Sequence, residues 1–143
     1  MVSATPANSE ETAIRGKMQQ WLAAYNSKDI DALLSLYSDK IYFANNSSSL
    51  KLGTEAIRRN FAPQFASSAR TSIDFSEELI TIGETLAHIG GKYRVNIPQD
   101  DGNILNAYGR VLLIFEKEND EWKLIVDIDN TGNDITAADF ENN

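Results

Sequence analysis

The sequence predicts an α+β fold in which three N-terminal helices pack on one face of a strongly curved, mainly antiparallel β-sheet. Apolar residues recur at helical spacing as far as Phe61, whereas from Thr71 onward they alternate with a period of two. Short polar or glycine-containing segments separate the later runs, which is typical of hairpins between antiparallel neighbours. Gly90 and Gly91 interrupt one of these runs, and paired glycines in a strand indicate a bulge or a sharp bend.

The first helix is expected from Ser9 to Asn26. Asn8 and Glu11 have the spacing of a capping box, and an apolar stripe follows them. The stripe consists of Ile14, Met18, Trp21, Leu22 and Tyr25. One face of this helix should therefore pack on the sheet.

Two shorter helices and a strand are expected next. Asp29 can cap a helix that ends near Ser38 and carries Tyr37 on its apolar stripe. A short strand follows from Ile41 to Ala44. Thr54 can cap the third helix, which Pro63 should end or bend because proline lacks a backbone donor. The later strands are expected at Ile73 to Ile82, Thr85 to Ile97, Ile104 to Lys117 and Glu121 to Asn130.

Composition excludes several functions. The 143 residues carry 13 Lys and Arg against 21 Asp and Glu, a net charge of −8 that argues against nucleic-acid or anionic-membrane partners. With no Cys and only His88, the chain cannot form a disulfide, a thiolate nucleophile or a two-histidine metal site. We therefore expect no metal and no cofactor. The first residues lack the pattern of a secretory signal, which predicts a cytoplasmic protein.

The length fits a single domain over residues 1–143, with loose tails at 1–9 and 132–143 where small and polar residues gather. Four short segments then carry a family resemblance across residues 10–131. They are Lys28 to Leu33, Tyr37 to Asp39, Gly53 to Ile57 and Glu121 to Asp127. In this order they resemble the nuclear transport factor 2-like superfamily, which includes SnoaL-like polyketide cyclases, steroid delta-isomerases and dehydratases. The resemblance implies a cystatin-like cone with a pocket between the helices and the concave face of the sheet.

Alternation predicts which side chains line that pocket. On the last strand the inward set is Trp122, Leu124, Val126, Ile128 and Asn130, and the outward set is Lys123, Ile125, Asp127 and Asp129. On the preceding strand the inward set is Gly109, Val111, Leu113 and Phe115, and the outward set is Tyr108, Arg110, Leu112 and Ile114. The second outward set is unusually apolar, and the resemblance implies back-to-back dimers, so we expect a homodimer through the outer sheet face.

The steroid-isomerase pattern aligns without gaps from Ile14 to Asn45. The resemblance implies that Trp21 replaces a tyrosine that hydrogen-bonds the enolate, and that Asn45 replaces the aspartate base. A second acid would fall near Val111, which has no polar atom. An amide cannot accept a proton at useful pH, so the sequence argues against steroid isomerisation by this route.

The candidate ligand-binding residues are Trp21, Tyr25, Asn45, Tyr93, Val111 and Asn130. Simple packing remains an alternative for Trp21 and Tyr25, and Asn45 is either a polar group of the pocket or a loop residue. His88 alternates with Ala87 and Ile89 and so belongs to the outward set of its strand, which predicts a structural role or a role in the dimer face. No catalytic residue can be assigned.

Two functions remain open. The first is a small-molecule-binding or association domain with a hydrophobic cone pocket, which an interior poor in acids favours. The alternative is a cofactor-independent isomerase, cyclase or dehydratase acting on a small apolar carbonyl compound, which needs a proton acceptor that faces inward. An open cavity with an ionisable carboxylate would favour the enzyme, and a cone filled with aromatic side chains would favour association.

Overall fold

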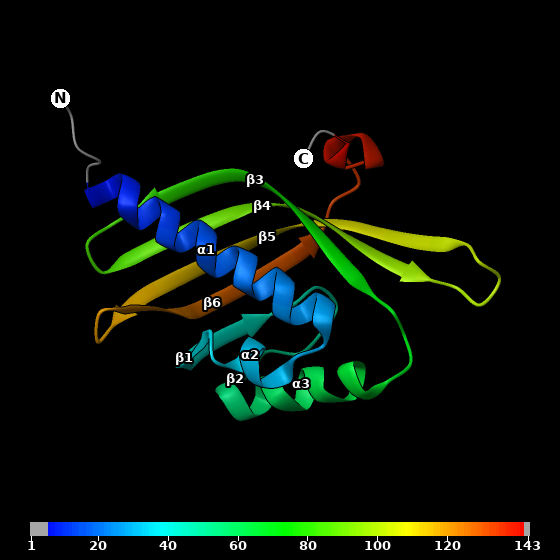
Figure 1. Cartoon of the computed structure of the whole chain (residues 1–143), viewed down its shortest axis with the longest axis horizontal. Coiled ribbons are helices and arrows are strands. Elements are labelled where there is room, and N and C mark those ends of the chain that lie inside the picture. Colours follow the sequence, from blue (N-terminus) through cyan, green and yellow to red (C-terminus); the bar gives the residue numbers. More distant parts are fainter. Residues whose placement is uncertain (1–5, 142–143) are drawn as a thin grey trace.

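The structure is a computed structural model that describes residues 6–141. A six-stranded sheet of order β2-β1-β6-β5-β4-β3 is antiparallel throughout, except between β1 and β6. The α-helices lie on its concave face (Figure 1), which confirms the predicted α+β fold class. The elements are α1 (Pro6–Ser27), α2 (Ile30–Leu34), β1 (Tyr37–Ala44), β2 (Lys51–Leu52), α3 (Thr54–Ala66), β3 (Ser72–Ile82), β4 (Leu86–Pro98), β5 (Ile104–Glu118), β6 (Glu121–Thr131) and the 3₁₀ helix η1 (Ala137–Phe140).

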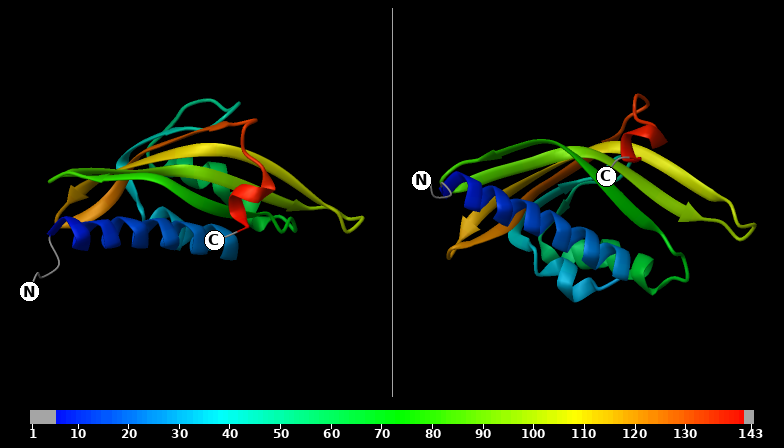
Figure 2. Two further views of the ribbon diagram at one scale, coloured as in Figure 1. Left: turned by 90° about the horizontal axis from the view of Figure 1, so that it is seen from above. Right: turned by 45° about the horizontal axis from the view of Figure 1, so that its top comes forward.

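Helix α1 is longer than predicted, because it begins at Pro6 rather than Ser9. Asn8 therefore lies inside the helix and is not its cap, while residues 1–5 of the predicted tail lie outside the described part. The apolar stripe faces the sheet as predicted, with Ile14, Met18 and Tyr25 buried. Figure 2 shows the sheet bending around this helix.

Helix α2 begins as the sequence predicts but ends earlier. The Asp29 carboxylate accepts a hydrogen bond of 3.1 Å from the N–H of Ala32, which confirms the cap. The helix stops at Leu34 instead of near Ser38, and Tyr37 is the first residue of β1. The reason is pairing with β6, where the N–H of Leu124 donates to the carbonyl of Leu36 at 2.9 Å. Pairing with a distant strand therefore places in β1 residues that the local periodicity assigned to a helix.

Helix α3 differs from its predicted cap. Gly53, at a positive φ of 84°, precedes the helix and provides no side-chain cap, and Thr54 is the first helical residue. The helix continues past Pro63 to Ala66. Ile57 and Phe61 are buried as expected and hold α3 against the sheet.

Two bulges shape the antiparallel part of the sheet, and the parallel pairing of β1 with β6 has a further register shift between Tyr37 and Tyr42. At the predicted glycine pair, Glu77 is opposite Gly91 and Leu79 is opposite Gly90, so Glu78 of β3 is the extra residue. A Cβ on Gly91 would overlap the backbone of β3, which explains the glycine there. The second bulge was not predicted. In β6, Val126 pairs with Ile114 and Leu124 pairs with Phe115, which leaves Ile125 as the extra residue.

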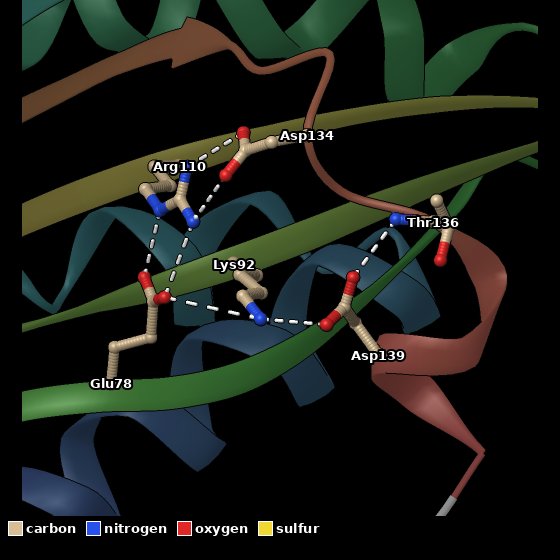
Figure 3. Close-up of polar contacts among 6 residues, drawn as sticks. All are labelled: Glu78, Lys92, Arg110, Asp134, Thr136 and Asp139. Carbon is tan, nitrogen blue, oxygen red and sulfur yellow. Dashed lines mark hydrogen bonds and ion pairs between the residues drawn. The ribbon is translucent and has the colours of Figure 1, made fainter.

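The segment after β6 packs on the outer face of the sheet instead of forming the predicted loose tail. Arg110 holds both carboxylate oxygens of Asp134 at 3.0 Å, and Lys92 binds Asp139 at 2.6 Å (Figure 3). Phe140 is only 8% exposed, because it packs beside Tyr108 and under the Arg94 guanidinium. Basic side chains of the outer face and the buried ring of Phe140 therefore hold this segment on the sheet.

The rest of the outer face stays uncovered. Leu79, Leu112 and Ile128 lie in one ladder row across four strands, with Gly90 between the first two. Their exposed fractions are 47%, 36% and 40%. The outward parity predicted for Leu112 holds, and the bulge places Ile128 beside it on the outer face, contrary to its predicted inward parity.

None of the helices in residues 6–141 is both long enough and apolar enough to cross a bilayer.

Candidate functional site

A pocket of about 380 Å³ lies between α1, α3 and the concave face of the sheet. This volume is in the range of small-molecule sites. Five aromatic side chains form much of its wall, namely Trp21, Tyr25, Phe43, Phe61 and Tyr93. The uncharged polar lining residues are Asn45, Asn46, Ser48, Asn60, Gln64 and Thr131. Two carboxylates, those of Asp127 and Asp129, complete the polar part of the wall.

The bulge at Ile125 places these carboxylates in the pocket. One extra residue reverses the alternation of every side chain that follows it in the strand. Asp127 and Asp129 therefore face inward, and Asn130 faces outward, opposite Arg110. The predicted parity is right for Trp122 and Leu124, before the bulge, and wrong for the residues after it. The prediction of an outward charge row and an acid-poor interior is consequently wrong.

Asp127 is the most deeply placed ionisable group of the pocket. It lies between Leu113 of β5 and Phe43 of β1 and is 3% exposed. Its Oδ2 accepts a hydrogen bond of 3.1 Å from the Tyr37 hydroxyl, and no described side chain donates to its Oδ1. Burial raises the pKa of Asp127 to about 7, although the Tyr37 hydrogen bond acts in the opposite direction. Near neutral pH this carboxyl can therefore both take up and release a proton.

Tyr37 links Asp127 to helix α1. The indole N–H of Trp21 donates to the Tyr37 oxygen at 2.9 Å, and the Tyr37 hydroxyl donates onward to Asp127. Burial is the main reason that the pKa of Tyr37 lies well above its usual value, with the charge of Asp127 adding to it. Tyr37 thus remains a neutral donor that fixes the orientation of the Asp127 carboxylate.

Asp129 is held by neutral donors from the end of β1. The side-chain amide of Asn45 donates to Oδ2 at 2.6 Å, and the backbone N–H of Asn46 donates to Oδ1 at 2.7 Å. This assigns a positioning role to Asn45, the position where the resemblance implies a catalytic base. The carboxylate here lies on β6, the strand next to β1, and not at the end of β1 where the resemblance implies it.

Tyr93 enters the pocket over a glycine. It is paired with Gly109 across β4 and β5, and a Cβ on Gly109 would overlap the Tyr93 ring. No described residue hydrogen-bonds the Tyr93 hydroxyl. Burial, with a contribution from the charge of Asp129, raises the pKa of Tyr93 to about 12, so the phenol is protonated at neutral pH. In addition to its two carboxylates, the pocket therefore contains a hydroxyl donor, that of Tyr93, which has no described acceptor.

Most of the predicted site residues meet in this pocket. Trp21, Tyr25, Asn45, Tyr93 and Val111 line it, whereas Asn130 lies on the opposite face of the sheet because of the bulge. Their contact with a ligand stays a prediction. Sequence reasoning missed Tyr37, Asp127 and Asp129. The available signal was the run Asp127-Ile128-Asp129, which places two acids on the same side of the strand.

Comparison with known proteins identifies the family and the fold of this chain. A family model of the SnoaL-like domain matches residues 14–126. No curated protein matches the sequence. A conserved protein from Planctomyces limnophilus is similar in structure, with a TM-score of 0.78 and 22% identity over 87% of this chain and 97% of that one. So is a ketosteroid isomerase-like protein from Erwinia carotovora atroseptica, with a TM-score of 0.74 and 15% identity over 87% and 97%.

A third similar structure is described as a nuclear transport factor 2-like protein with a cystatin-like fold, from Novosphingobium aromaticivorans. Its TM-score is 0.75, with 15% identity over 92% of this chain and 87% of that one. At such identities the solved structures establish the fold alone. The family match and the fold together show a protein of the nuclear transport factor 2-like superfamily. Within it, the chain belongs to the SnoaL-like domain family.

Proposed function

We propose that this chain binds a small carbonyl compound in its pocket and catalyses proton transfer on it without a cofactor, as an isomerase, cyclase or dehydratase does. The observation that carries the proposal is the Asp127 carboxylate, which is buried in the pocket wall with its Oδ1 left without a described donor. Such a group supplies the inward-facing proton acceptor that this class of reaction needs.

The remaining residues have complementary roles in this mechanism. Asp127 takes the proton from the carbon next to the carbonyl, and Tyr37 stabilises its charged form by a hydrogen bond. The phenol of Tyr93 donates to the carbonyl oxygen as negative charge develops there. The aromatic wall excludes water from the reacting atoms, which strengthens both interactions. No step requires a metal or an organic cofactor.

Binding without chemistry, or association alone, is the competing possibility. A cone filled by aromatic side chains would favour association, but a pocket of about 380 Å³ remains between the helices and the sheet. The space supports a small-molecule function, and the two carboxylates in its wall support proton transfer over passive binding.

Deuterium exchange next to a carbonyl tests this function. The probes are cyclohexanone, 1-indanone and 2-tetralone in D₂O buffer at pH 7, followed by ¹H NMR. We expect the protein to accelerate exchange of at least one ketone, and Asp127→Asn to reduce that rate by about 10²–10⁴-fold. We expect Tyr93→Phe to reduce it by about 10²–10³-fold.

Asp100→Asn is the matched control, because Asp100 is an exposed turn residue and its replacement should leave exchange unchanged. Exchange that persists in folded Asp127→Asn would remove the assigned base. Binding of the ketones with no acceleration at all would make the protein a binding domain instead.

We also propose that two copies associate through the uncovered part of the outer sheet face. The row formed by Leu79, Leu112 and Ile128 supports this, because exposed apolar side chains in one contiguous row usually mark an interface. A cytoplasmic location stays a prediction from the sequence.

A further inference from the structure

The charged side chains that line the pocket are all acidic. Among the described residues that line it, two are aspartates and none is lysine, arginine or histidine. The whole chain carries a net charge of −8, which adds to the negative potential in the pocket. An anionic ligand would meet repulsion from both aspartates, and no basic side chain of the lining would offset it.

The two pocket aspartates are buried or partly buried and yet form no ion pair. On the outer face, Arg110 and Lys92 pair with Glu78, Asp134 and Asp139 (Figure 3). No ion pair in residues 6–141 includes Asp127 or Asp129. The donors to Asp129 are the neutral groups of Asn45 and Asn46, which orient its carboxylate and leave its charge in place.

Buried or partly buried carboxylates are normally paired, because removing a charge from water is costly unless an opposite charge is near. Asp127 accepts a hydrogen bond from one neutral donor, and burial raises its pKa, which favours the protonated form. Asp129 is only partly buried, and its two donors, Asn45 and Asn46, lie with the exposed Ser48 at the rim of the pocket. A cation at this rim would find a carboxylate already oriented for it.

The aromatic wall favours the same ligand charge. Trp21 is stacked on Tyr25 with ring centroids 5.3 Å apart, and aromatic faces attract cations. The protein itself uses this interaction at one ring of the wall, because the ammonium of Lys28, which does not line the pocket, lies 4.6 Å from the Tyr25 ring centre. Lys28 already lies over the Tyr25 ring, whereas no described cation lies over the other four rings of the wall, those of Trp21, Phe43, Phe61 and Tyr93.

We propose that the pocket takes an organic ammonium compound, with the ammonium group beside Asp129 and the apolar body among the aromatic side chains. This inference rests on the proposed function in that it names the ligand class of the same pocket. The two aspartates then have separate tasks. Asp129 pairs with the ligand cation, and Asp127 remains available for proton transfer.

Three matched probes test the ligand charge at pH 8: 2-phenylethylammonium chloride, 2-phenylethanol and sodium phenylacetate. Binding is followed by the indole N–H resonances in ¹H–¹⁵N NMR. Trp21 lines the pocket, whereas Trp122 is buried outside its lining and serves as an internal reference. We expect the ammonium to bind about tenfold or more tightly than the alcohol, and phenylacetate to bind more weakly than either. Only the Trp21 resonance should move.

Asp129→Asn should lower the affinity for the ammonium to that for the alcohol and leave the affinity for the alcohol within about twofold. Asp100→Asn, with its exposed turn position, should keep the preference. Equal or tighter binding of the alcohol or of phenylacetate overturns the inference, as does the absence of any Trp21 shift or an ammonium preference that survives Asp129→Asn. The ketone exchange assay is separate: exchange without ammonium preference overturns this inference alone, and preference without exchange overturns only the proposed chemistry.

Discussion

The hydroxyl of Tyr37 donates a 3.1 Å hydrogen bond to the buried carboxylate of Asp127, joining the first residue of β1 to the centre of β6. The bond brings together two residues that are 90 positions apart in the sequence. It also stabilises the charged form of an acid whose surroundings favour the neutral form. The behaviour of this pair determines the first two predictions.

Asp127→Asn should change the pH dependence of stability. The pKa of Asp127 is raised from 3.8 to about 7 by burial, so between these values the folded chain holds a proton that the unfolded chain has lost. The contribution of this group to stability therefore falls as pH rises through that window. The variant should match wild type near pH 4 and exceed it above pH 7, by at most on the order of 4 kcal/mol.

Urea unfolding at pH 4.5, 6 and 8 measures this difference. Asp100→Asn, at an exposed turn position, should show no pH-dependent difference from wild type. A constant difference between Asp127→Asn and wild type at all three pH values would mean that Asp127 does not titrate in this range.

Tyr37→Phe should raise the pKa of Asp127 further, because the ionised carboxylate loses its described donor. It also removes the acceptor of the Trp21 indole N–H. Together these changes should cost about 1–3 kcal/mol of stability. Carbon-detected NMR titration of the carboxyl resonances follows the pKa. Trp21→Phe is the control, since it leaves the Tyr37–Asp127 hydrogen bond in place, and an equal pKa shift in both variants would contradict this account.

Gly109→Ala should damage the pocket. A Cβ at this position would overlap the Tyr93 ring and the carbonyl oxygen of Asn130. Displacing them should cost roughly 1–3 kcal/mol and move Tyr93 from its place in the pocket. Gly16→Ala is a matched control in α1, where a Cβ meets nothing within 4 Å. That change should be neutral or stabilise by roughly 0.5–1 kcal/mol. Thermal unfolding and the ketone exchange assay report both effects, and unchanged exchange in Gly109→Ala would remove Tyr93 from the mechanism.

Leu112→Lys should dissociate the proposed dimer. The side chain lies in the outer-face row between Ile128 and Gly90, where an added ammonium group would be buried against apolar neighbours. Sedimentation at micromolar concentration should change from about twice 15.9 kDa to 15.9 kDa. Leu105→Lys is the control, because Leu105 is exposed near the tip of the β4–β5 hairpin. A wild-type chain that sediments as a monomer would contradict the proposed association.

Local sequence signals predicted the helices and strands well where local forces decide them. The Asp29 cap, the stripe from Ile14 to Tyr25 and the inward parity of Leu113 are set by neighbours in the chain. The local signals gave wrong predictions where contacts with residues far away in the sequence determine the structure. Tyr37 was expected in a helix but lies in β1, where it pairs with β6. The segment around Phe140 was expected to be loose but packs on the sheet against Arg94 and Tyr108.

By itself the sequence determined the α+β class, because periodicity is a local property of the chain. Strand parity and the family resemblance then suggested six candidate residues, of which five line the pocket. The tertiary structure alone decided that the pocket is acidic. An extra residue at Ile125 has no local signature, since a bulge exists only relative to the pairing of β6 with β5. That pairing turns Asp127 and Asp129 inward and thereby provides the chemistry of the site.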